Sequence, residues 1–195
     1  MKKPLFCGTL ILGILLSSLV GLRAEEMPTR TLKGIEFLVG IGLSKLKAIG
    51  SHRFYPLTVD FDFDLKPLAR KINFSPAALL EFQIETFLAP VSQPRRNIET
   101  GVSFFFKIGA LPETARLQPY LKLGVGMDYM TLHTREQSTQ YNYTETGAVG
   151  AHYFFNQNVA LTVEGRFRHL SNSGIKHPNQ GINSRFAFLG IAYRF

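Results

Sequence analysis

One stretch decides the fold: VALTVEGRFRHLS, residues 159–171. The odd positions from Val159 to Phe167 hold apolar side chains or glycine, whereas the even positions from Thr162 to Arg168 are polar or charged. A period of two is the side-chain spacing of a β-strand with one apolar and one polar face. The stretch therefore predicts a strand that separates two different environments.

The same alternation recurs in seven further stretches. They are residues 35–43, 57–65, 80–88, 98–108, 121–129, 149–155 and 187–195. Eight strands of about ten residues, each long enough to cross a bilayer at a tilt of about 45°, are typical of an outer-membrane barrel. A closed sheet also pairs every backbone N–H and C=O inside lipid, because it has no open edge. The predicted fold class is all-β, an eight-stranded antiparallel transmembrane β-barrel.

The polar face of these strands is predicted to fill the lumen, because eight strands leave room only for side chains. The charged residues on this face are Asp60, Asp62, Glu81, Glu85, Lys122, Asp128, Glu164 and Arg166. A soluble β-sandwich or lipocalin-like barrel, with the apolar face inside, is the alternative. Two features favour the membrane. Large apolar residues continue along nearly every strand, and the chain ends on Tyr193, Arg194 and Phe195, which resembles the C-terminal recognition signal of outer-membrane barrels.

Residues 1–24 are predicted to form a secretory signal peptide, followed by the barrel domain at residues 25–195. Lys2 and Lys3 precede an apolar run, and Ala24 offers a small residue for cleavage. A transmembrane anchor is the alternative, but the run is short and no stop-transfer pattern follows. The single cysteine, Cys7, lies in this leader, so the mature chain would contain no disulfide. Together these features predict the bacterial outer membrane.

Both termini of an eight-stranded barrel lie on the periplasmic side. The extracellular loops are therefore predicted at residues 45–53, 90–97, 133–142 and 172–183, with a short periplasmic turn at residues 156–158. The formal net charge is +8, and the export signal favours an anionic lipid over nucleic acid as the partner. The basic residues in these loops either contact lipid phosphates or are simply solvated, and the sequence is compatible with both roles. They are Lys45, Lys47, Arg53, Arg95, Arg96, Arg135 and Lys176.

A histidine and a serine follow the apolar face of the stretch quoted first. Continuing by two from Phe167 places His169 and Ser171 on the lipid-facing side, about 6.6 Å apart along the strand, near its extracellular end. In nucleophilic catalysis the serine attacks an ester and the histidine takes and returns its proton. The side chain of Asn172 and the N–H of Gly174 are placed to stabilise the oxyanion. The alternative is that the strand has left the membrane and both residues are simply solvated.

The stretch HLSNSGIK (residues 169–176), followed by PNQGI (residues 178–182), resembles the signature of the lipid A 3-O-deacylase (PagL) family. The resemblance implies an eight-stranded barrel that removes the acyl chain ester-linked at position 3 of lipid A. It implies His169 as the base, Ser171 as the nucleophile, and Asn172 and Gly174 as the oxyanion site. The implied partner is lipid A or lipopolysaccharide in the outer leaflet. A monomer and a homodimer both fit the sequence.

One position departs from the family pattern. Asn183 stands where the family has the glutamate of a Ser-His-Glu triad. Pairing Phe155 with Val159 across the turn at residues 156–158 places Glu145 opposite His169, on the same outer face. We therefore expect Glu145 to orient or charge His169, with Asn183 assisting. The alternative is that Glu145 is an ordinary carboxylate of the barrel rim.

Two other functions fit the same residues. The protein could be an inactive barrel with a structural or adhesion role, because the acid has become Asn183, or an esterase acting on another lipid. No cofactor and no metal are expected. The other histidines lack the spacing and the carboxylate neighbours of a metal site: His52, His133, His152 and His177.

Overall fold

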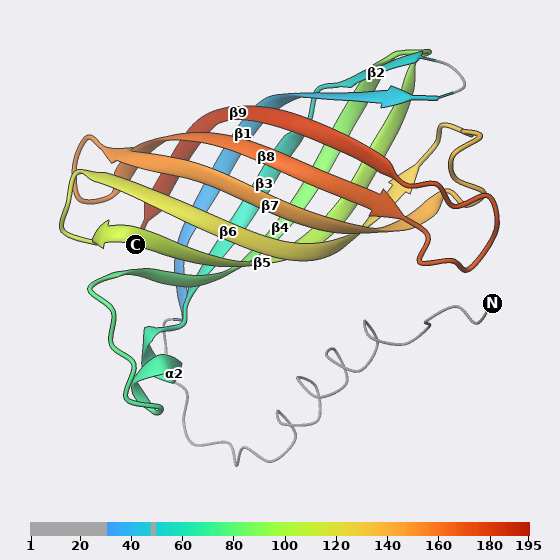
Figure 1. Cartoon of the computed structure of the whole chain (residues 1–195). Coiled ribbons are helices and arrows are strands. Elements are labelled where there is room, and N and C mark those ends of the chain that lie inside the picture. The colour runs from blue at the N-terminus through green and yellow to red at the C-terminus, as the bar shows by residue number, and fades with distance from the viewer. Residues whose placement is uncertain (1–30, 48–49) are drawn as a thin grey trace. The chain divides into compact units, whose positions relative to one another are not determined.

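The computed structural model describes residues 31–47 and 50–195. The predicted signal peptide lies outside these residues. Nine antiparallel strands and one five-residue helix make up the described chain (Figure 1). They are β1 (Leu32–Leu46), β2 (Gly50–Phe54), β3 (Leu57–Asp64), α2 (Lys66–Arg70), β4 (Ala78–Gln93), β5 (Asn97–Pro112), β6 (Leu117–Met130), β7 (Tyr141–Phe154), β8 (Val159–Ser171) and β9 (Ile182–Arg194).

The sheet closes into a ring because β1 pairs with both β3 and β9, the last strand. β2 and β3 together form one wall strand, since each pairs with β1 on one side and β4 on the other. The break between them falls at Pro56, which has no N–H to donate to a ladder. Its carbonyl still accepts the N–H of Gly40 at 2.9 Å. The predicted eight-stranded barrel is thus confirmed.

Two loop predictions were partly wrong. The loop predicted at residues 45–53 contains β2, and the loop predicted at residues 90–97 is shortened because β4 runs to Gln93. In both places the hairpin continues, since β2 pairs with β1 and its Arg53 also pairs with Gln93. The other two predicted loops lie at residues 131–140 and 172–181, within two residues of the predicted bounds. No helix among the described residues is long and apolar enough to cross a membrane.

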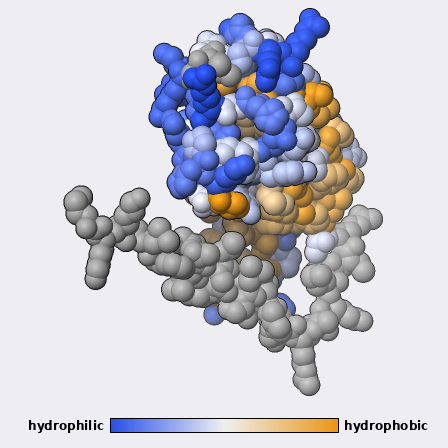
Figure 2. Space-filling model, turned by 90° about the vertical axis from the view of Figure 1, so that its right-hand side faces the viewer, coloured by the Kyte–Doolittle hydropathy of each residue, from blue (hydrophilic) through white to orange (hydrophobic). Residues whose placement is uncertain are grey.

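The two faces of the wall are chemically inverted relative to a soluble barrel. The charged residues predicted for the lumen are buried, whereas large apolar side chains stand exposed outside, with Phe37 at 59% and Phe106 at 62% exposure. This distribution confirms the membrane-barrel prediction over the soluble alternative. Figure 2 views the barrel towards the end that carries loops 131–140 and 172–181. Hydrophilic residues gather over that end, and hydrophobic ones cover the side wall in view.

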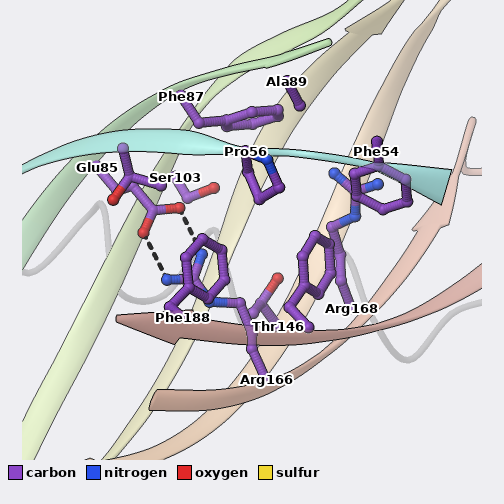
Figure 3. A pocket seen from close by; sticks show the side chains of 12 residues that line it. Phe54, Pro56, Glu85, Phe87, Ala89, Ser103, Thr146, Arg166, Arg168 and Phe188 are labelled. Carbon is purple, nitrogen blue, oxygen red and sulfur yellow. Dashed lines mark hydrogen bonds and ion pairs between the residues drawn. The ribbon is translucent and has the colours of Figure 1, made fainter. Parts of the chain in front are cut away.

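Ion pairs occupy the lumen. Arg166 donates two hydrogen bonds to Glu85, at 2.6 and 2.7 Å (Figure 3). It also donates to Glu164. Arg168 binds Asp128 at 2.7 Å and Glu99 at 2.9 Å. Aromatic rings pack beside both guanidinium groups, around a small cavity of about 20 Å³. Paired charges satisfy each other where water is scarce, so the even-numbered residues of β8 are held firmly inward.

Candidate active site

His169 and Ser171 lie on the outer face of β8, close to its C-terminal end. Between them Leu170 points inward, where it packs with Leu46, Met130, Leu132 and Ile182. Because side chains alternate along a strand, this inward anchor fixes the outward direction of its two neighbours. The predicted lipid-facing orientation of the pair follows from the same alternation.

The neighbouring strands place an amide and a carboxylate on either side of His169. His169 pairs with Asn183 of β9 and with Glu145 of β7. The pairing with Glu145 is the one predicted from the sequence. The ring Nδ1 and the Asn183 Oδ1 are 2.6 Å apart. An amide oxygen accepts only, so Nδ1 carries the proton and Nε2 is left as the basic nitrogen. Within the described chain, Glu145 makes no hydrogen bond to this ring.

The hydroxyl of Ser171 lies beside the turn that follows β8. Its Oγ accepts the N–H of Ser173 at 3.5 Å, a long contact. Among the residues described, it makes no hydrogen bond with His169. In serine hydrolases without substrate this bond is often long or poorly aligned, and it tightens when substrate binds. The structure thus brings the two predicted residues onto one face without joining them.

Gly181 supports the far side of the imidazole. Its φ of +72° is left-handed, and a Cβ built on it would lie 2.5 Å from the His169 Cε1. Only glycine combines that backbone with such a close approach. This glycine is part of the PNQGI motif, but no role was predicted for it from the sequence. Its place at the end of a Pro-Asn-x-Gly turn is the signal that could have revealed one.

Asn172 and Gly174 already have hydrogen-bond partners in the two loops that surround them. Asn172 is fully buried, and its amide nitrogen donates to the carbonyl of Lys176 at 2.7 Å and to the Ser138 hydroxyl at 3.2 Å. Its amide oxygen accepts the N–H of Gly174 at 3.0 Å. Both groups predicted as oxyanion donors therefore already have partners. The N–H directed at the Ser171 oxygen belongs instead to Ser173.

A second loop supports the loop after β8. The N–H of Ser138 donates to the carbonyl of Pro178 at 3.0 Å, and its hydroxyl donates to that of Lys176 at 2.8 Å. The N–H of Gln180 donates to the carbonyl of Glu136 at 2.9 Å. These backbone bonds hold Gly181, and with it His169, against residues 131–140. Sequence reasoning missed this support, because it joins loops far apart along the chain.

Two other histidines, His52 and His152, are buried and make contacts away from this site. His52 is buried between the hydroxyl of Ser44, at 2.9 Å, and Glu99, at 3.2 Å. His152 lies in the lumen and bonds Thr162. Across residues 31–47 and 50–195, no group of three His, Cys, Asp or Glu side chains is arranged to hold a metal ion.

Comparison with known proteins identifies the family. A family model described as "Lipid A 3-O-deacylase (PagL)" matches residues 57–192, a range that contains His169, Ser171 and Asn183. The chain belongs to the PagL family. A search of curated proteins found no match. The family resemblance carried by the motifs at residues 169–176 and 178–182 is thereby confirmed.

Solved structures agree on the fold of this PagL-family chain. The crystal structure of the outer membrane enzyme PagL is 17% identical over 78% of this chain and 97% of that one, with a TM-score of 0.61. Neisserial surface protein A is 11% identical over 83% and 96%, with a TM-score of 0.63. Family and fold together confirm the predicted location in the bacterial outer membrane. Neither these comparisons nor the described residues support a homodimer.

Proposed function

We propose that this chain is a serine ester hydrolase that removes the 3-O-linked acyl chain of lipid A within the outer leaflet. The observation that carries the proposal is the hydrogen bond between His169 and Asn183, on the outer face that also bears Ser171. A base with a fixed tautomer, next to a hydroxyl at the membrane surface, suits an ester that never leaves the bilayer. Family membership supports the same chemistry.

The reaction would run through an acyl-enzyme. His169 Nε2 takes the proton of Ser171 as its oxygen attacks the ester carbonyl. The tetrahedral intermediate collapses, the sugar oxygen leaves, and the imidazolium returns the proton to it. A water then attacks the acyl-serine, again giving its proton to His169. The fatty acid is released and the Ser171 hydroxyl is restored.

The N–H of Ser173 is our candidate for the oxyanion donor. It already points at the Ser171 oxygen, whereas the N–H of Gly174 is held by Asn172. Ser173 and Gly174 both have left-handed backbones, with φ of +53° and +79°. Two successive residues of this kind make a sharp turn that aims the Ser173 N–H back at the strand end. Asn172 and Gly174 would then act by shaping this turn.

Glu145, on the side of His169 opposite to Asn183, would balance the positive charge of the imidazolium. Asn183 holds the tautomer but carries no charge, whereas Glu145 is a carboxylate on the neighbouring strand. Opposed residues on one face have Cβ atoms about 5 Å apart, close enough for attraction without a direct hydrogen bond. We therefore assign orientation to Asn183 and charge to Glu145.

Gly181→Ala is expected to lower kcat by about 100-fold. The added methyl would displace the His169 ring from Asn183, and a misplacement of about 1 Å costs a factor of this size. Gly50→Ala is the matched control, because Gly50 also has a left-handed backbone but open space around its Cβ position. Initial rates on detergent-solubilised lipid A measure both variants. Equal losses in the two would contradict a role for Gly181 in placing the imidazole.

Lipid A from cells with and without the gene tests the function itself. Mass spectrometry should show the loss of one 3-O-linked acyl chain only where the folded protein is present. Retention of that chain in both samples, and with purified protein given detergent and a defined substrate, would contradict the proposal. Loss of a different acyl chain would instead indicate an esterase of other specificity.

A barrel without chemistry is the second candidate. One observation favours it: an amide, Asn183, stands at the acid position. Such a protein would tolerate Ser171→Ala with no change in lipid composition, whereas the hydrolase would not.

A further inference from the structure

Three basic side chains continue the outer face beyond the active site. Arg185 of β9 pairs with Phe167 of β8 on one side and Leu43 of β1 on the other. Leu43 in turn pairs with Arg53 of β2. Lys45 lies two residues further along β1, on the same face as Leu43. Directly opposed residues point to the same side of a sheet, so all three basic groups face outward, and all three are exposed.

These cations have no partner within the described part of the chain. Lys45, Arg53 and Arg185 make no ion pair and no side-chain hydrogen bond there. Arg166 and Arg168, by contrast, each bind two carboxylates in the lumen. A cation on a lipid-facing surface raises the free energy of the protein unless an anion compensates it. The described residues supply no such anion to these three side chains.

Charge is distributed unevenly about the catalytic pair. Glu145 lies on β7, on one side of His169, whereas Arg185 and Lys45 lie on β9 and β1, on the other. Neighbouring strands are about 4.8 Å apart, so these cations stand roughly 5 and 10 Å to the side of His169 at the backbone. Their long side chains cover that span. An anionic headgroup would therefore be attracted over β9 and β1 and repelled from β7.

We propose that Lys45, Arg53 and Arg185 bind the phosphate groups of the lipid headgroup and so determine which way round the substrate lies at Ser171. The inference rests on the proposed function for the identity of the reacting ester. Phosphate is the anion of choice because it carries up to two charges, accepts forked hydrogen bonds from arginine, and is part of the lipid A headgroup itself. Lys45 and Arg53 were predicted to lie in an extracellular loop, and no role was predicted for Arg185.

Binding can be measured without turnover by using Ser171→Ala as the parent protein. Native mass spectrometry in detergent would compare phosphorylated lipid A with its enzymatically dephosphorylated form. We expect the parent to prefer the phosphorylated lipid. Adding Lys45→Gln and Arg185→Gln should raise its Kd about 30-fold, since each cation near an anionic lipid surface is worth about a factor of five. Affinity for the dephosphorylated form should stay within about twofold.

Arg95→Gln with Arg96→Gln is the matched control, because it removes two exposed charges from the loop between β4 and β5. This control should keep the preference for phosphate. Equal weakening in both double variants, or no weakening in either, would overturn the inference. If the preference behaves as expected while the wild-type barrel releases no acyl chain, the phosphate site stands and the proposed function fails.

Discussion

Ser171→Ala is expected to lower the rate of 3-O-acyl release by about 10⁴-fold or more. The variant removes the only group in the proposed mechanism that forms a bond to the substrate, and losses of this size are typical when a catalytic serine is deleted. The side chain lies on the outer face of β8, away from the lumen ion pairs, so the barrel should fold normally. Rates on purified, folded protein measure the effect.

Ser173→Ala is the control for this result. Ser173 is exposed and two residues away, and its alanine variant keeps the backbone N–H assigned to the oxyanion. We expect it to retain activity within about tenfold of the wild type. If Ser171→Ala kept comparable activity, Ser171 would not be the nucleophile.

Asn183→Ala is expected to lower kcat by about 10²- to 10⁴-fold with little change in KM. The substitution removes the acceptor 2.6 Å from the His169 Nδ1, so that the ring is free to rotate and to adopt the other tautomer. Disturbing the corresponding partner in a serine protease costs a factor near the upper end of this range. Asn183→Glu tests the reverse change. It keeps a hydrogen-bond acceptor for His169 and adds a negative charge, so its rate should exceed that of the wild type.

Glu145→Gln separates orientation from charge. It keeps the size of a side chain that makes no hydrogen bond to His169 in the described structure, and it removes only the negative charge. A loss of about tenfold is expected, and the difference from wild type should shrink at high salt because Glu145 is exposed. Full activity in Glu145→Gln, combined with inactivity in Asn183→Ala, would leave Asn183 as the sole partner of the imidazole.

The register of the barrel could be predicted from the sequence because side chains alternate strictly along a strand. A slip by one residue would turn every apolar side chain of β8 into the lumen, so only one phase is compatible with the pattern. The short turn at residues 156–158 then fixed the pairing of β7 with β8, and Glu145 lies opposite His169 as expected. Alternation also determines that Asn172, two residues beyond Leu170, faces inward.

The loops could not be predicted in the same way. The placement of Gly181 depends on bonds from Ser138 and Glu136 in another loop, and no short-range pattern encodes such contacts. The strand at Gly50–Phe54 was not predicted because Pro56 separates it from β3 and because it contains few apolar residues. Arg185 was overlooked because an isolated charge in an apolar strand has meaning only once its neighbours on β1 and β8 are known.

Trapping of the acyl-enzyme is the most direct test of a lipid-facing Ser171 that hydrolyses lipid A. The purified barrel would be mixed with lipid A bearing a defined 3-O-acyl chain, quenched in acid within milliseconds to seconds, and digested for mass spectrometry. The account predicts that the peptide containing Ser171 gains the mass of that acyl group, while the lipid loses it. Unmodified Ser171 peptide together with intact 3-O-acylated lipid, from protein shown to be folded, would contradict it.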